Sequence, residues 1–235
     1  MKKKVTRKEL KQMIKRGEDV TNVDTSGITD MSYMFHGESS FNQDISSWDV
    51  SNVKDMMCMF YKASSFNQDI GKWNVSNVTN MLCMFRVASS FNEDIGKWNV
   101  SNVTNMYGMF YLATSFNQDI TNWDVSNVTN MSWLFDNASS FNQDISSWDV
   151  SNVKDMRYMF EGASSFNQDI SGWNVSNVTD MPYMFRNASS FNQAKIYKWF
   201  NKNKRVKEEI FRGSKLENNK QFKRLLEVSA AINEL

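Results

Sequence analysis

Phenylalanine returns at every twenty-fifth position through most of this 235-residue chain. The series runs Phe41, Phe66, Phe91, Phe116, Phe141, Phe166 and Phe191, and a methionine series from Met31 and a tryptophan series from Trp48 keep the same step. A fixed period of about 20 to 50 residues is typical of proteins whose repeats stack along one axis. We therefore predict that identical side chains meet in columns through the interior, and that the function belongs to a surface.

The composition follows from this period, because 14 of the 17 phenylalanines lie in two series that begin at Phe35 and Phe41. The formal net charge of +1 conceals a segregation of charge along the chain. Residues 1–16 carry +7, residues 194–235 carry +6, and the residues between them carry −12. The basic ends are interpreted as solvated caps, with end-to-end self-association or contact with an anionic partner as alternatives.

The repeat that starts at Ser40 has apolar residues in two different patterns. These residues are Phe41, Ile45, Trp48, Val50, Val53, Met56, Met59, Phe60 and Ala63. The last four have the spacing i, i+3, i+4, i+7, which predicts about two turns of helix, with Asp55 in front of it as an N-cap. The alternation around Trp48 and Val50 predicts extended strands. Each unit is thus predicted to be strand, turn, strand and short helix.

Polar residues repeat with the same step and predict ladders along the stack. Asn42 and Asn52 begin two asparagine series whose amides can satisfy backbone groups of neighbouring repeats. Asp44, Asp69, Asp94, Asp119, Asp144 and Asp169 form a third series. Because like charges about 5 Å apart repel, each carboxylate needs backbone donors or a cation. Turn capping is the favoured interpretation of this series, and calcium between coils is the alternative.

The repeat is absent from both ends of the chain, and these end segments are predicted to be caps. Thr6 and Glu9 predict a capping box for a helix over 6–16, and Gly17 ends it. Residues 195–205 and 216–232 are predicted to be helical, and Ser214 with Glu217 forms a second predicted capping box. The predicted domains are therefore an N-terminal capping helix (1–18), about seven coils (19–193) and a C-terminal helical cap (194–235). Lids of this kind protect the apolar end coils of a repeat stack, although an independent basic interaction helix is an alternative.

Residues 41–60, FNQDISSWDVSNVKDMMCMF, and their copies resemble the mycoplasma-type 25-residue repeat of BspA-like leucine-rich-repeat surface proteins. The resemblance covers about residues 19–193. It implies an α/β repeat solenoid, namely a leucine-rich-repeat-like right-handed coil of short parallel strands and short helices, closed by helical caps at both ends. Members of that family are often surface lipoproteins, adhesins or other interaction proteins, and the resemblance brings no catalytic residues with it.

The cysteines and the absence of targeting segments bound the compartment. Cys58 and Cys83 occupy the same place in successive repeats, and with one histidine in the chain they do not make a zinc site. Free thiols are predicted, with an inter-coil disulfide as the alternative. The charged start contains no apolar signal-peptide core, and no stretch is apolar enough for a membrane helix. These features predict a cytoplasmic protein by default, or a surface or secreted protein if the chain is located like many members of the BspA-like family.

The variable positions of the repeat indicate where a partner would bind. Tyrosine, tryptophan and arginine are the residue types that anchor interfaces, and they concentrate on the outer side of the predicted helices. The candidate partner-binding residues are Tyr33, Met57, Tyr61, Leu82, Arg86, Tyr107, Tyr111, Leu112, Trp133, Tyr158, Tyr183 and Arg186. We expect an exposed, partly apolar band there, although unconstrained drift of these positions is an alternative.

The predicted function is a non-enzymatic scaffold that binds a protein or a glycan through this face. His36 is predicted to be a surface residue, and the carboxylates lie in regular ladders without the single asymmetric pair that acid–base chemistry needs. No catalytic, cofactor-binding or metal-binding residues are predicted. A structural or self-assembling rod and an adhesin-type surface protein are the alternatives, and the charge of −12 in the central segment argues against nucleic acid as a partner.

Overall fold

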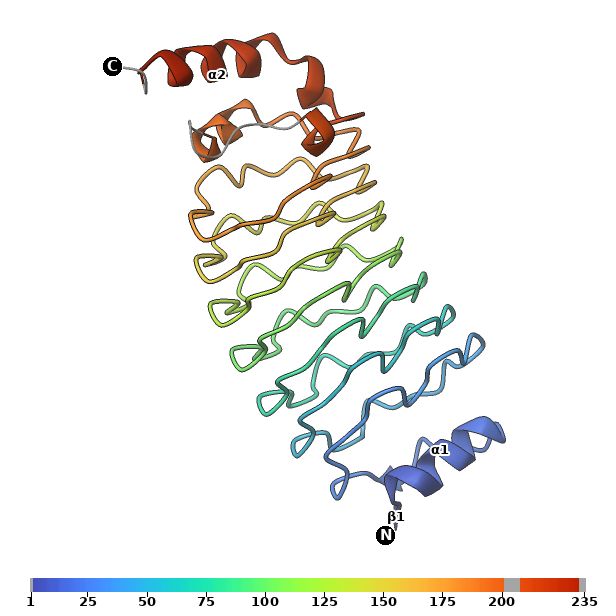
Figure 1. Cartoon of the computed structure of the whole chain (residues 1–235). Helices are drawn as coiled ribbons and strands as arrows, with labels where there is room; N and C mark the ends of the chain where they lie inside the picture. The colour runs from blue at the N-terminus through green and yellow to red at the C-terminus, as the bar shows by residue number, and fades with distance from the viewer. Residues whose placement is uncertain (1, 201–207, 233–235) are drawn as a thin grey trace.

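The computed structural model describes residues 2–200 and 208–232, and Figure 1 shows these residues as a stack of coils. The helix α1 (Arg7–Lys15) lies at the N-terminal end of the stack and the helix α2 (Lys220–Ile232) at the other end. The strands β1 (Lys3–Lys4) and β2 (Val23–Asp24) pair in parallel, with Lys3 opposite Val23. The described residues after the repeats include the 3₁₀ helices η1 (Ala194–Trp199), η2 (Glu208–Ile210) and η3 (Lys215–Asn218).

The interior of the stack consists of columns of identical side chains, as the period predicts. Phe110 illustrates the arrangement, since its ring centroid lies 5.7 Å from those of both Phe85 and Phe135 in the neighbouring coils. Within its own coil the Phe110 ring stacks on Phe116 at 4.0 Å and lies 6.3 Å from Trp123. All five side chains are buried. One continuous aromatic core therefore joins every coil to the next.

The extended half of each repeat does not form the predicted strands. Among the described residues, parallel pairing between repeats is limited to single bridges, such as Asp30 with Asp55 and Asp55 with Asn80. The predicted strand segment is broken by turns at 46–47 and 51–52 and their equivalents, so no run is long enough for a ladder. The alternation of Trp48 and Val50 still gives the correct burial, because both side chains lie in the core.

The predicted helix over 56–63 is also wrong, because this segment is a chain of tight turns. The N–H of Cys58 donates to the Leu82 carbonyl of the next coil at 2.8 Å, whereas the N–H of Met59 closes a turn on the Met56 carbonyl at 3.2 Å. The same alternation continues to the end of the segment, so every second N–H bonds between coils. A short helix carries a nucleation penalty, and the coil-to-coil bonds replace the ones it would have supplied. The same spacing of apolar residues fits both the predicted helix and the observed turns.

Polar side chains satisfy the backbone at the corners of the coils. The backbone N–H of Asn67 donates to the Asn42 side chain of the preceding coil at 2.9 Å, and the Asn77 side chain donates to the Ser51 carbonyl at 2.7 Å. The predicted turn capping by the Asp44 series is confirmed: the Asp44 carboxylate accepts the Ser46 N–H at 2.9 Å, and its bonds with Ser46 lower its pKa. In the described part of the chain no cluster of three or more His, Cys, Asp or Glu residues is placed to hold a metal ion.

The N-terminal cap agrees with its prediction. Thr6 and Glu9 form the predicted capping box, with the Thr6 hydroxyl accepting the Glu9 N–H at 3.2 Å and the Glu9 carboxylate accepting the Thr6 N–H at 2.8 Å. The helix α1 that follows buries Leu10, Met13 and Ile14. This apolar stripe covers the first coil, which would otherwise expose the ends of the core columns.

The C-terminal cap departs from its prediction. The helix predicted for 195–205 appears as η1, and residues 201–205 fall outside the described part of the chain. The helix predicted from residue 216 begins at Lys220. The second predicted capping box is wrong, because the Ser214 hydroxyl donates to the Phe211 carbonyl at 2.7 Å and the Glu217 carboxylate accepts the Gly213 N–H at 2.9 Å.

The core columns also continue beyond Phe191, where the sequence pattern was predicted to stop. Trp199 stacks on Trp173 with ring centroids 6.1 Å apart, and Phe211 stacks on Phe185 at 5.6 Å. Each of these steps is 26 residues in the sequence. One extra residue therefore removes the cap from the exact period, although its side chains occupy the next place in the same columns.

Candidate interaction surface

The turns over 56–63 and their equivalents give each coil two positions with a left-handed backbone. The first position is Tyr33, Cys58, Cys83, Gly108, Trp133, Tyr158 or Tyr183, and the second is Gly37, Lys62, Val87, Leu112, Asn137, Gly162 or Asn187. The φ angles of the non-glycine residues lie between 53° and 62°. Left-handed backbone costs an L-residue roughly 1–2 kcal/mol, and glycine avoids that cost. Most coils nevertheless carry a large side chain at the first position.

The side chains of these turns touch one another from coil to coil, beginning at the N-terminal end. The Tyr33 ring lies 5.7 Å from His36, which in turn lies 4.8 Å from Tyr61. The Arg86 guanidinium follows, 5.7 Å from the Tyr61 ring and 4.1 Å from the Tyr111 ring. Arg86 thus bridges two aromatic rings through cation–π contacts.

The contacts continue without a break to the last repeat. The Tyr111 ring lies 5.6 Å from Trp133, and Trp133 lies 4.4 Å from Tyr158. Tyr158 stacks on Tyr183 at 4.9 Å, and the Arg186 guanidinium lies 4.6 Å from the Tyr183 ring. We call this series the aromatic row; its members are Tyr33, His36, Tyr61, Arg86, Tyr111, Trp133, Tyr158, Tyr183 and Arg186.

The structure brings eight of the twelve candidate binding residues into the aromatic row, and it adds His36. Met57 touches the edge of the row, since the Tyr33 hydroxyl lies 3.8 Å from its sulfur atom. Leu82, Tyr107 and Leu112 are half-buried in the same turn segments. The band expected to be exposed is half-buried: Tyr33 is exposed, but the other row tyrosines and Trp133 are half-buried because each ring covers its neighbour.

The sequence did not predict the acidic pair that lies beside the row. Asp136 is 1% exposed, and burial together with the nearby Glu161 carboxylate raises its pKa to about 7. Its carboxylate accepts a hydrogen bond from the Asn137 side chain. Glu161 accepts a hydrogen bond from Nε of Arg186 at 2.7 Å. The equivalent residues of the other coils are His36, Tyr61, Arg86, Tyr111 and Arg186, so the pattern gives no sign that a carboxyl is buried here.

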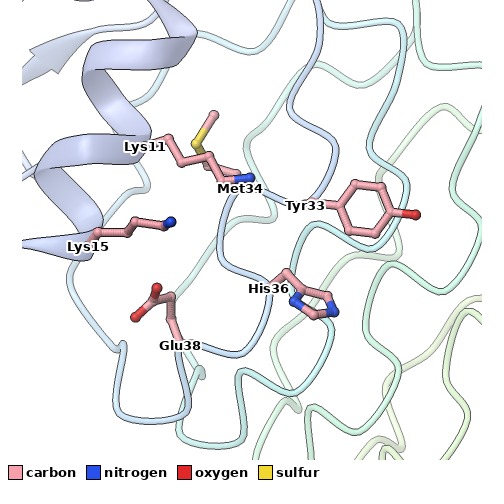
Figure 2. Close-up of a pocket in the computed structure, with 6 residues that line it drawn as sticks. All are labelled: Lys11, Lys15, Tyr33, Met34, His36 and Glu38. Carbon is pink, nitrogen blue, oxygen red and sulfur yellow. The ribbon is translucent and has the colours of Figure 1, made fainter.

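A small pocket lies at the N-terminal start of the aromatic row. Its volume is about 310 Å³, and it is lined by Lys11, Lys15, Tyr33, Met34, His36 and Glu38. Figure 2 shows the two lysines reaching from α1 toward the first coil, with the Tyr33 and His36 rings across from them. The pocket therefore combines two ammonium groups and one carboxylate with the first two rings of the row.

The stacked columns, the coil-to-coil hydrogen bonds and the repeating surface define this molecule as a repeat protein with a 25-residue unit. The chain belongs to the DUF285 family, whose description is "Mycoplasma protein of unknown function", and the family model matches residues 5–123 and 108–224. This finding confirms a mycoplasma-type repeat family. No curated protein and no solved structure gives a match.

Among the described residues, no helix has the length and apolar character that a membrane crossing requires.

Proposed function

We propose that this protein is a non-enzymatic scaffold that binds a protein or a glycan through the aromatic row. The observation that carries the proposal is the presence of large rings on strained backbone. Tyr33, Trp133, Tyr158 and Tyr183 have φ between 56° and 62° at a position where Gly108 serves equally well for the fold. Every coil has left-handed backbone at this position, so the fold requires the conformation but not a large ring on it. Side chains held on strained backbone cluster at ligand-binding and functional sites. Drift alone would favour glycine or asparagine at this position.

The chemistry of the row supports a ligand with both apolar and polar faces. Half-buried tyrosine and tryptophan rings offer flat apolar surface at a small cost in side-chain entropy, and they keep a polar edge for hydrogen bonds. Arg86 and Arg186 add charge at two points along the row. A glycan chain or an extended peptide lying along the stack would meet several of these groups at once. Asp136 is 1% exposed, and Glu161 is buried and paired with Arg186, so neither carboxyl is open to a substrate, which favours binding over catalysis.

The family resemblance supports the finer assignment. We propose that the stack is a leucine-rich-repeat-like right-handed solenoid related to BspA-like proteins, and that the protein serves as an adhesin-type interaction module. The mycoplasma-type family match is consistent with this assignment.

The experiment replaces the centre of the row. The triple variant Tyr111→Ser, Trp133→Ser, Tyr158→Ser is expected to weaken binding to the ligands that the native chain selects from a glycan array and a displayed peptide library. The expected loss is at least tenfold, about 1.4 kcal/mol, because interface aromatics commonly contribute ~2 kcal/mol each. Binding is measured by surface plasmon resonance, with near-ultraviolet circular dichroism as the check on folding.

The matched control is the triple variant Lys72→Ser, Lys97→Ser, Asn122→Ser, which changes exposed residues at a different turn of three coils. It should bind as the native chain does. The proposal is rejected if the folded aromatic variant keeps its affinity, or if the native chain selects no ligand from either library.

A further inference from the structure

The two cysteines are stacked on one another at the left-handed position of successive coils. Cys58 has φ 53° and Cys83 has φ 54°, and both thiols are free. Each residue donates its backbone N–H to the following coil at 2.8 Å, to Leu82 and to Tyr107 respectively. Coils joined in this way lie about 4.8 Å apart, which falls within the ~4.4–6.8 Å range of Cα separations found in disulfides. The spacing of the coils is therefore compatible with a disulfide between Cys58 and Cys83.

The two thiols have different surroundings, and these shift their pKa values in opposite directions. Cys83 faces Gly108 of the next coil, where an added Cβ would lie 3.3 Å from the sulfur and 3.7 Å from a guanidinium nitrogen of Arg86. Gly108 has no side chain to fill the space beside the Cys83 sulfur and the Arg86 guanidinium, and these two groups interact through a hydrogen bond. Hydrogen bonding with Cys58 and the charge of Arg86 lower the pKa of Cys83 to about 7, although burial opposes the shift. Hydrogen bonding with Cys83 and burial raise the pKa of Cys58.

Cys58 is 7% exposed and Cys83 is 5% exposed, so both thiols are mostly buried. The low pKa of Cys83 and the neighbouring thiol of Cys58 are nevertheless the two features that oxidation to a disulfide needs. We propose that Cys58 and Cys83 form a peroxide-sensitive dithiol that closes into a disulfide between two coils. The Cys83 thiolate attacks one oxygen of hydrogen peroxide, the O–O bond breaks, and hydroxide leaves and takes up a proton to become water. The sulfur of Cys58 then attacks the Cys83 sulfenic acid, the S–O bond breaks, and a second water leaves with the Cys58 proton. Overall two thiols are oxidised and one peroxide is reduced to two waters.

The dithiol lies within the proposed binding surface, so its oxidation would affect neighbouring residues of that surface. Interaction with Cys58 raises the pKa of Tyr33, and interaction with the Cys83 thiolate opposes the effect of burial and raises the pKa of Arg86. Oxidation removes the negative charge that Arg86 faces and leaves its guanidinium to the rings of Tyr61 and Tyr111. It also crosslinks the chain across 25 residues, which restricts the unfolded state and raises the melting temperature.

The test treats the full-length chain with excess hydrogen peroxide and measures free thiols, intact mass and disulfide-linked peptides. The expected result is the coordinated loss of both thiols, a mass lower by two hydrogen atoms, a linked peptide pair containing Cys58 and Cys83, and a chain that remains monomeric. In Cys58→Ser the same treatment should leave a Cys83 sulfenic acid that dimedone traps.

A second measurement on the native chain does not depend on any variant folding. The rate of iodoacetamide alkylation at Cys83 should rise with a midpoint near pH 7, well below that of an ordinary thiol. The proposal is overturned if both thiols stay free in excess peroxide, if the only disulfides join separate chains, or if Cys83 is alkylated with the pH profile of an ordinary thiol. None of these outcomes bears on ligand binding by the aromatic row, which is tested separately.

Discussion

Phe110→Ala is expected to destabilise the protein by about 3–5 kcal/mol, the largest effect that we predict for a single substitution. The Phe110 side chain is fully buried between Phe85 and Phe135, which lie one coil away on either side. Its removal leaves a cavity in the middle of a column. The cavity cannot collapse easily, because the backbone of this coil is hydrogen-bonded to the next one, with the Phe110 N–H 3.0 Å from the Leu134 carbonyl. Urea unfolding followed by tryptophan fluorescence measures the loss.

Phe41→Ala is the matched control for this prediction. Phe41 begins the other phenylalanine column, is 9% exposed, and stacks on Phe66 on one side. Its replacement should therefore cost less than that of Phe110. Equal losses at the two positions, or a loss below about 1 kcal/mol at Phe110, would contradict a continuous stacked core.

Asp136→Asn is expected to stabilise the protein by about 2–4 kcal/mol at pH 8 and to flatten its pH dependence. Burial first, and then the Glu161 carboxylate, raise the folded-state pKa of Asp136 to about 7, from an ordinary value near 3.8, while Arg186 and Arg86 oppose this shift. Between these two pH values the folded chain holds a proton that the unfolded chain releases. The native protein therefore loses stability as the pH rises from about 4 through 7. Asparagine has the same shape and stays neutral, so the variant avoids this loss.

The control for the pH prediction is Asp119→Asn, for which the sign is reversed. Bonds with Thr121 lower the pKa of Asp119, so its charged form supports the fold above the ordinary pKa and this support is lost in acid. The variant should be no more stable than the native chain at pH 8. Chemical denaturation at several pH values measures both variants. A native-like decline in stability between pH 4 and 7 in Asp136→Asn would show that another group is responsible.

The sequence predicted which positions of the repeat face inward and which face outward, because apolar residues of the same type recur every 25 residues at the buried positions. Phe60, Trp73 and Val75 are buried as expected, and the asparagine ladders bond as expected. The local backbone could not be predicted in the same way. Apolar residues at i, i+3, i+4 and i+7 face one side in a helix and also in the observed turns. Glycine marks the left-handed positions that separate the two structures in only a few coils, as at Gly37 and Gly108, and residues such as Cys58 and Lys62 occupy them elsewhere, so the sequence signal was weak.

The sequence predicted which residue types form the candidate surface, but it did not predict which of these residues contact one another. Several steps of the row join the same position in adjacent coils, such as His36 with Tyr61, but the row changes position where Tyr111 contacts Trp133 of the next coil. Such a diagonal contact requires the path of the backbone, which the repeat alone does not give. The C-terminal extension of the core was missed for a simpler reason, because its 26-residue step does not match the period.

The most direct test of the account deletes one coil. Removal of residues 91–115 joins Ser90 to Phe116 and keeps every remaining residue in phase with the 25-residue period. If identical side chains stack in columns, the shortened chain should remain folded, with native-like near-ultraviolet circular dichroism and a scattering profile whose longest dimension is shorter by about 4.8 Å. Deletion of 91–103 should unfold the protein, because it places unlike residues in the same column. Equal tolerance of the two deletions, or unfolding by the in-phase one, would contradict the stacked architecture.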